Sequence, residues 1–175
     1  YQRALPDYMA TSDSDLAYRR AKDHFDRSIQ PPAGDNPRIS LPFIWRSELG
    51  NGVSVLGAVN DETPTTTIRL SMTVGQRDEP LEKLGLAAIT ASMMNEATLK
   101  STNEELSNRL QKLGSTITFS ADNNMTTVAI RSLSENVDAT LAIAAEKLLQ
   151  PKFDSDDFKR VKAQTLQAIQ SSKTN

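Results

Sequence analysis

Strict two-residue alternation in three segments constrains the fold of this chain more than any other feature. In TPTTTIRLSMTV, residues 63–74, apolar side chains occupy every second position from Ile68 to Val74. The segments STITFSA (115–121) and MTTVAIRSL (125–133) alternate in the same way and are joined by the polar turn DNN. A period of two is typical of strands with one buried face. The last two segments therefore predict a β-hairpin.

Two helices are predicted between the first of these strands and the hairpin. The segment 82–106 is small and apolar in its first half and polar in its second. Ser101 and Glu104 have the spacing of a capping box, which marks the start of the second helix. Gly114 suits the position just past the end of that helix.

Two further helices are predicted after the hairpin. Their apolar stripes are Val137, Leu141, Ala144 and Leu148 in one, and Phe158, Val161, Thr165 and Ile169 in the other. Pro151 ends the first of them. A short strand after the turn Asn51-Gly52 completes the order ββααββαα. This order predicts the α+β class, with a largely antiparallel sheet and helices packed on one face.

The first 42 residues differ from the rest and are interpreted as a helical arm and a proline-rich linker. A helical stripe is formed by Tyr18, Ala21, Phe25 and Ile29, with Asp13 or Ser14 as its N-cap. Pro31 and Pro32 end this helix, and Trp45 is expected to anchor the arm to a domain at 43–175. Because the chain opens on Tyr1 and stops without a closing element, we expect this domain to be the first part of a longer one.

Composition excludes several classes of function. Twenty Lys and Arg residues nearly balance 22 Asp and Glu residues, so the basic surface expected of a nucleic-acid binder is missing. The chain has no cysteine and therefore no disulfide or thiolate metal site. No apolar run reaches the roughly 18 residues that indicate a transmembrane helix.

The candidates for chemistry outside the segment 82–106 each have a structural interpretation that we favour. His24, the only histidine, lies between Asp23 and Asp26, where a solvated helix face outweighs a metal ligand. An acidic cluster consists of Asp154, Asp156 and Asp157. Its carboxylates suit calcium or magnesium, but carboxylates in the first turn of a helix are also favoured by the helix dipole. The glycines lack the spacing of a phosphate-binding loop; they are Gly50, Gly52 and Gly57.

Five segments in order resemble the pitrilysin/insulinase family of zinc metallopeptidases, the inverzincins, from about Trp45 to the end of the chain. They are ELGNGVSV, IRLSMTVGQRDEP, GLAAITASMMNEAT, LSNRLQKLGSTITFSAD and AAEKLLQPKFDSDDFKRVK. The family carries the zinc motif His-x-x-Glu-His in the third segment. The resemblance places Ala88 and Ser92 at its histidines and Ala91 at its catalytic glutamate. The later glutamate ligand is missing too, since no glutamate follows Glu146.

The resemblance implies a non-catalytic half of a zinc metalloendopeptidase, with no catalytic, cofactor or metal residue of its own. Zinc is then held by a preceding catalytic half or a partner subunit, and this segment supplies scaffold and the wall of a chamber for unfolded peptides. Only the resemblance suggests a compartment, the bacterial periplasm or envelope. Two alternatives stay open, a partner-binding core protein of the same fold without peptidase activity and an unrelated α+β binding domain.

Overall fold

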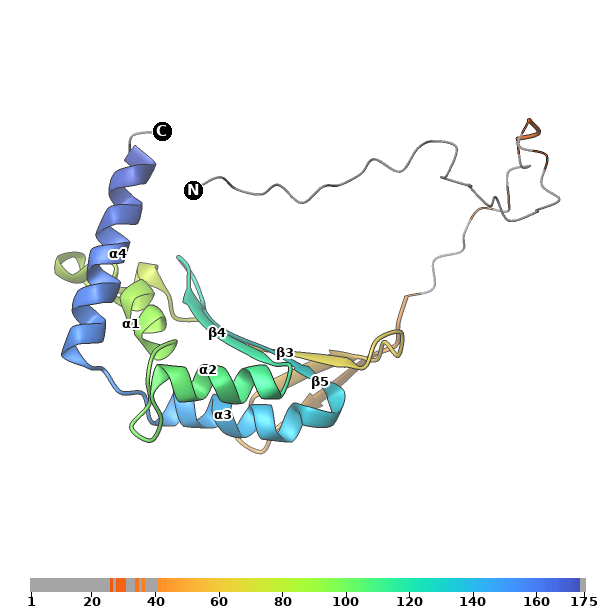
Figure 1. The fold of residues 1–175 in the computed structure, drawn as a ribbon, viewed down its shortest axis with the longest axis horizontal. Helices are drawn as coiled ribbons and strands as arrows, with labels where there is room; N and C mark the ends of the chain where they lie inside the picture. The colour runs from red at the N-terminus through yellow and green to blue at the C-terminus, as the bar shows by residue number, and fades with distance from the viewer. Residues whose placement is uncertain (1–25, 27, 31–33, 35, 37–40, 174–175) are drawn as a thin grey trace, which may run out of the picture. The chain divides into compact units, whose positions relative to one another are not determined.

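The computed structural model describes residues 26, 28–30, 34, 36 and 41–173 of the chain (Figure 1). Contacts divide the chain into two compact units, Tyr1–Leu41 and Pro42–Asn175. Most of the helix predicted in the first 30 residues lies outside the described residues, as do His24 and the pair Pro31 and Pro32. The interpretation of residues 1–42 as an arm and linker therefore stays a prediction.

The first two strands form a hairpin of their own. β1 (Ile44–Glu48) pairs antiparallel with β2 (Ser54–Ala58). The chain turns at Gly52, whose φ of 83° lies in the left-handed region that glycine adopts without strain. The Trp45 ring lies over Gly57, where any Cβ would overlap it. The predicted turn and the strand after it are confirmed, but β1 was not predicted, because its residues IWRSE do not alternate.

The main sheet has three strands in the order β3-β5-β4, and both neighbouring pairs are antiparallel. The strands are β3 (Thr65–Met72), β4 (Thr116–Ala121) and β5 (Thr126–Leu133). Their register sets Ile68, Ile130 and Ile117 in one row. The alternation predicted from the sequence is confirmed, although β3 ends at Met72 rather than continuing to Val74.

Four α-helices accompany the sheet. They are α1 (Leu86–Met94), α2 (Asn103–Lys112), α3 (Val137–Leu149) and α4 (Ser155–Lys173). Three short 3-10 turns are η1 (Gln76–Asp78), η2 (Leu81–Lys83) and η3 (Ser134–Asn136). None of the described helices has the combination of length and apolar character that a bilayer span requires.

The core lies on one face of the main sheet. Eight buried side chains from α1, α2, α3, β4 and β5 form one cluster, which consists of Ala91, Leu106, Ile117, Phe119, Val128, Ile130, Ile143 and Ala144. On the opposite face the side chains of Arg69, Thr118 and Arg131 are exposed. Figure 1 shows α2 and α3 on the same side of the sheet. The predicted α+β class, with helices on one face of an antiparallel sheet, is confirmed.

The N-terminal capping box of α2 differs from the predicted one. The capping box joins Thr102 and Glu105, one residue later than the predicted Ser101 and Glu104. The Thr102 hydroxyl accepts from the Glu105 N–H, and the Glu105 carboxylate accepts from the Thr102 N–H at 2.8 Å. Gly114 follows the helix as predicted and has a φ of 58°. In this conformation the N–H groups of Gly114 and Ser115 donate to carbonyls of the last helical turn.

The buried face of α3 differs from the predicted stripe. Thr140 is fully buried, whereas Leu141 is 37% exposed. The Thr140 hydroxyl lies 2.8 Å from the hydroxyl of Ser115 and 2.9 Å from that of Ser132. It also donates to the Asn136 carbonyl. The prediction was wrong here because a search for apolar periodicity overlooks a threonine, which can be buried when its hydroxyl is hydrogen-bonded.

The stripe of α4 is buried only in part. Val161 is 4% exposed, but Phe158 and Ile169 are 43% and 47% exposed. Thr165 is half-buried, and its hydroxyl donates to the Val161 carbonyl. The helical period was therefore predicted correctly, while burial along the whole stripe was not, because among the described residues α4 packs chiefly against α1.

We predict that Leu106→Ala lowers the free energy of unfolding by about 2–5 kcal/mol, because it leaves a cavity in the core. Leu106 is 1% exposed, and Leu149, at 75% exposed, provides the matched control as Leu149→Ala. Urea unfolding followed by circular dichroism measures both. An equal decrease in the free energy of unfolding of the two variants would contradict the assignment of Leu106 to the core.

Candidate functional site

Helix α1 holds the three positions that the resemblance assigns to the zinc motif. Ala91 is 2% exposed and belongs to the core cluster. Ala88 and Ser92 are half-buried, and the Ser92 hydroxyl donates to the Ala88 carbonyl at 2.9 Å. Two methyl groups and a hydroxyl already bonded within the helix offer no imidazole or carboxylate to zinc. These residues do not fit the metal.

The N-terminus of α1 is held by Glu79. One carboxylate oxygen accepts from the N–H of Gly85 and the other from the N–H of Ala87, both at 2.6 Å. Gly85 precedes the helix with a φ of 94°. The first N–H groups of a helix have no partner within it, and a carboxylate there also interacts favourably with the helix dipole. Glu79 thus supplies the cap that Gly85, which lacks a side chain, cannot.

The C-terminus of α1 is joined to β4 by Asn95. Its amide nitrogen donates to the carbonyls of Ala91 and Phe119, at 3.0 and 2.9 Å. Its amide oxygen accepts from the Phe119 N–H at 2.9 Å. The side chain therefore pairs with the free edge of β4 as a short strand would, and it fixes the distance between the helix and the sheet.

Lys147 of α3 also binds the C-terminal end of α1. Its ammonium group donates to the carbonyls of Asn95 and Glu96, at 2.8 and 3.0 Å, and the residue is 3% exposed. Burial lowers the pKa of Lys147, and the carboxylates of Glu96 and Glu146 oppose this effect. A cation at the end of a helix satisfies its last carbonyls. A buried lysine here has a structural explanation.

Two ion pairs link elements around the end of α1, one between Glu96 and α4 and one between α2 and α3. Arg160 of α4 lies 2.7 Å from Glu96, and hydrogen bonds to Glu96 and Asp157 raise its pKa. Arg109 of α2 lies 3.0 Å from Glu146 of α3, whose side chain is 12% exposed. Partial burial opposes ionisation of Glu146, but hydrogen bonds from Thr98, Ser101 and Arg109 lower its pKa to about 2.

A hollow of about 400 Å³ lies between α1 and α4, beside Ser92. Its one ionisable lining residue among those described is Glu96, which is already paired with Arg160. No group of three or more His, Cys, Asp or Glu side chains within the described part of the chain is arranged to hold a metal ion. The hollow therefore has no set of groups that converge on a ligand.

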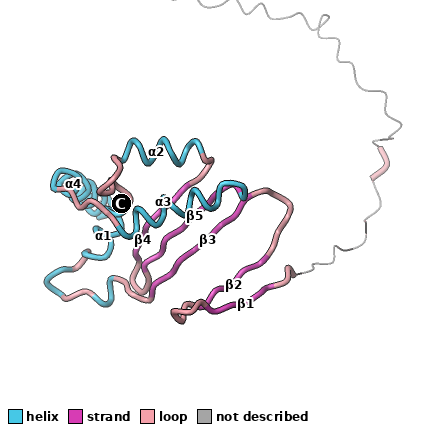
Figure 2. The backbone as a smooth tube through the Cα atoms, turned by 90° about the horizontal axis from the view of Figure 1, so that it is seen from below, coloured by secondary structure: helices cyan, strands magenta, loops and turns pink. Residues whose placement is uncertain are grey.

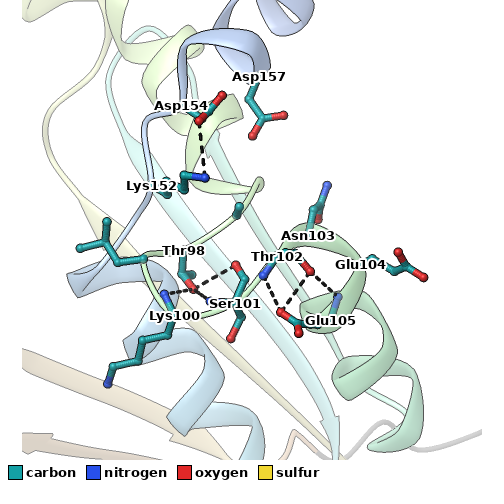
Figure 3. Close-up of a pocket in the computed structure, with 12 residues that line it drawn as sticks. Thr98, Lys100, Ser101, Thr102, Asn103, Glu104, Glu105, Lys152, Asp154 and Asp157 are labelled. Carbon is teal, nitrogen blue, oxygen red and sulfur yellow. Dashed lines mark hydrogen bonds and ion pairs between the residues drawn. The ribbon is translucent and has the colours of Figure 1, made fainter.

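A second hollow, of about 590 Å³, lies between residues 97–105, which form a loop and the first turn of α2, and residues 152–157 (Figure 3). Its polar groups bind one another. The Thr98 hydroxyl accepts from the Ser101 N–H at 2.9 Å, and Lys152 lies 3.5 Å from Asp154. The capping-box residues Thr102 and Glu105 are also part of its lining. The arrangement closes a loop and starts a helix, and the acidic side chains in the lining do not form a group of three that could hold a metal ion.

The family model of Insulinase (Peptidase family M16) matches residues 55–175. This chain belongs to the insulinase family. The resemblance found in the sequence is thereby confirmed. A search of curated proteins gives no match. The 175 residues of this M16 chain contain one histidine, so the motif His-x-x-Glu-His is absent from them.

Solved structures resemble the M16 chain over most of its length. One is the peptidase M16 inactive domain from Pseudomonas fluorescens, with a TM-score of 0.69 and 25% identity over 75% of this chain and 32% of that one. Another is a protease from Helicobacter pylori, with a TM-score of 0.60 and 22% identity over 70% of this chain and 30% of that one. The second likeness concerns the fold alone. The chain spans about a third of the length of both.

The other residues considered in the sequence are structural where the structure describes them. Asp154 accepts from the Asp156 N–H at the start of α4, and Asp156 and Asp157 pair with Lys159 and Arg160. Asp26 accepts from the N–H and hydroxyl of its neighbour Ser28, while His24 and Asp23 lie outside the described residues. The glycines at 50, 52 and 57 belong to the first hairpin and its turn.

Sequence reasoning missed the three residues that hold α1. Glu79 lies in a segment quoted for the family resemblance, IRLSMTVGQRDEP, but nothing there identifies its partners. Asn95 and Lys147 act on backbone atoms of distant segments. One signal was available, a lysine on the α3 face that also carries buried Ile143 and Ala144. A charge at such a position indicates a specific partner.

We predict that Glu79→Gln lowers the free energy of unfolding by about 1–2 kcal/mol, because the amide loses the charge and one of the two acceptors. The matched control is Glu82→Gln, in an exposed residue of η2. Hydrogen exchange localises the effect, since the amide protons at the start of α1 should exchange faster in the Glu79 variant only. Unchanged exchange there would contradict the capping role.

We predict that Glu146 makes stability depend on pH. Its folded pKa of about 2 lies below the ordinary value of 4.5, so its contribution is present above pH 4.5 and is lost as pH falls toward 2. Glu146→Gln should cost on the order of 2 kcal/mol at pH 7, and the difference from wild type should shrink below pH 4.5.

Thermal unfolding measured from pH 7 to pH 3 tests this dependence. The control is Glu104→Gln, because Glu104 is an exposed glutamate in the first turn of α2. A difference between wild type and Glu146→Gln that stays constant over this range would contradict the depressed pKa.

Proposed function

We propose that this chain is a segment of a non-catalytic half of an M16 metalloendopeptidase. It supplies scaffold and part of the wall of a chamber that holds unfolded peptides, while zinc is bound by a catalytic half on the same polypeptide or on a partner subunit. The observation that carries the proposal is the absence of zinc ligands from the aligned positions of α1. The helix that bears the zinc motif in the family has Ala88, Ala91 and Ser92 at the aligned positions.

Two findings support this role. Ala91 contributes to the core instead of facing a cleft, and the hollow beside Ser92 has no free ionisable group in its described lining. The similar structure from Pseudomonas fluorescens is itself described as a peptidase M16 inactive domain. Together they favour a helix whose present task is packing. The zinc-dependent activity of the whole protein is inferred from the family.

Zinc content of the natural full-length polypeptide tests the proposal. Elemental analysis of protein purified without added metal should give close to one zinc per catalytic half, whether that half is on the same chain or on a co-purifying subunit. The isolated 175-residue chain should retain no stoichiometric zinc after dialysis. Tight zinc binding by this chain would contradict the alignment of α1. Absence of zinc and of a catalytic subunit from the natural protein would favour a structural core protein instead.

Restoring the motif gives a second test. We predict that Ala88→His, Ala91→Glu and Ser92→His together do not produce peptidase activity in this chain, because no glutamate follows Glu146 to act as the third ligand. Cleavage of an unfolded peptide, followed by mass spectrometry, measures this. The matched control is the same chain with only the two histidines, and circular dichroism checks that the triple variant is folded, because position 91 is buried. A cleaving triple variant would show that the third ligand is present and has been misplaced.

A further inference from the structure

The hairpin β1–β2 has an unpaired edge. Among the described residues β1 pairs with β2 alone, and its outer side faces no other strand (Figure 2). A two-stranded hairpin by itself is only marginally stable in water, and three or more strands stabilise it. A free strand edge is also a template for pairing with another chain. The edge of β1 is therefore suited to accept a further strand.

The free backbone groups on this edge belong to alternate residues. The Leu49 N–H donates to the Val53 carbonyl at 2.9 Å, which makes these two residues a hydrogen-bonded pair of the ladder. Hydrogen-bonded and non-hydrogen-bonded pairs alternate along an antiparallel ladder. The N–H and C=O groups of Ile44, Arg46 and Glu48 therefore point away from β2. They are available to another strand.

Opposite charges on this edge select one register for a second copy of the chain. When two β1 strands pair antiparallel about Ser47, Arg46 of each copy lies opposite Glu48 of the other, and the outward backbone groups of both residues meet. The symmetric registers centred on Arg46 and on Glu48 place like charges opposite each other. Such pairs are destabilising, so charge favours the register at Ser47 over both of these neighbours.

The same register brings exposed apolar side chains together. Trp45, which is 39% exposed, lies opposite Leu49 of the second copy, and Leu49 is 52% exposed. Neither Arg46 nor Glu48 has an ion-pair partner among the described residues. Both charges are therefore free to pair across such an interface.

We propose that this chain associates with a second copy of itself through the outer edge of β1. The product is a four-stranded antiparallel sheet, in the order β2-β1-β1-β2, with a two-fold axis at Ser47. An interface of this kind is isologous, because each copy presents the same residues to the other. The proposal does not depend on zinc, on peptidase activity or on the role proposed for α1.

Charge reversal tests the register. Sedimentation equilibrium of the 175-residue chain gives the dissociation constant of the dimer. Arg46→Glu and Glu48→Arg should each weaken the dimer by about tenfold or more, because two like-charge pairs replace two attractive ones. The double variant R46E/E48R restores opposite charges and should recover the wild-type constant. A monomeric wild-type chain, single variants without effect, or a double variant that stays weak would overturn the proposal.

A cysteine at the two-fold axis provides an independent test. The two Ser47 residues would meet as a non-hydrogen-bonded pair with Cα atoms about 4.5 Å apart, within the range of a disulfide. The chain has no cysteine, so Ser47→Cys introduces a single thiol. Mild oxidation should give a covalent dimer on a non-reducing gel. The control Ser54→Cys, on exposed β2, should remain a monomer; equal cross-linking of the two variants, or none at position 47, would contradict the interface.

Discussion

The attachment of α1 at both ends is the constraint on which the rest of the domain depends. Glu79 caps its first turn, while Asn95 ties its last turn to β4 and Lys147 ties it to α3. The bonds of Asn95 and Lys147 bring together segments that are far apart in sequence. Because a buried polar group left without a partner is costly, they fix one position of α1 against the sheet more strictly than apolar contacts would.

This attachment bears directly on function. A helix that presents metal ligands must turn polar side chains toward a cleft, but α1 turns Ala91 into the core and bonds Ser92 to its own backbone. The M16 fold is retained while the residues at the proposed motif positions contribute packing. Scaffold and chamber wall are roles that such a half can fill, since neither requires a group that transfers protons or binds a metal.

Local patterns predicted most of the fold, and the failures have physical causes. Alternation identified β3, β4 and β5, and the position of Gly114 marked the end of α2. The face of α3 was wrong because Thr140 hydrogen-bonds to Ser115 and Ser132, which no periodicity of apolar residues reveals. The candidate site was recognisable only through family resemblance. Two of its supporting residues, Asn95 and Lys147, bond to the backbone of distant segments, and sequence alone does not indicate such partners.

The free energy of unfolding of Ala91→Glu tests most directly whether α1 is now a structural helix. The substitution places the carboxylate of the family's catalytic residue at a position that is 2% exposed. If the position is core, the variant loses several kcal/mol, on the order expected for an unpaired buried charge, while Leu86→Glu at the exposed start of α1 loses little. A variant as stable as wild type would show that the position opens to water, and would contradict the account.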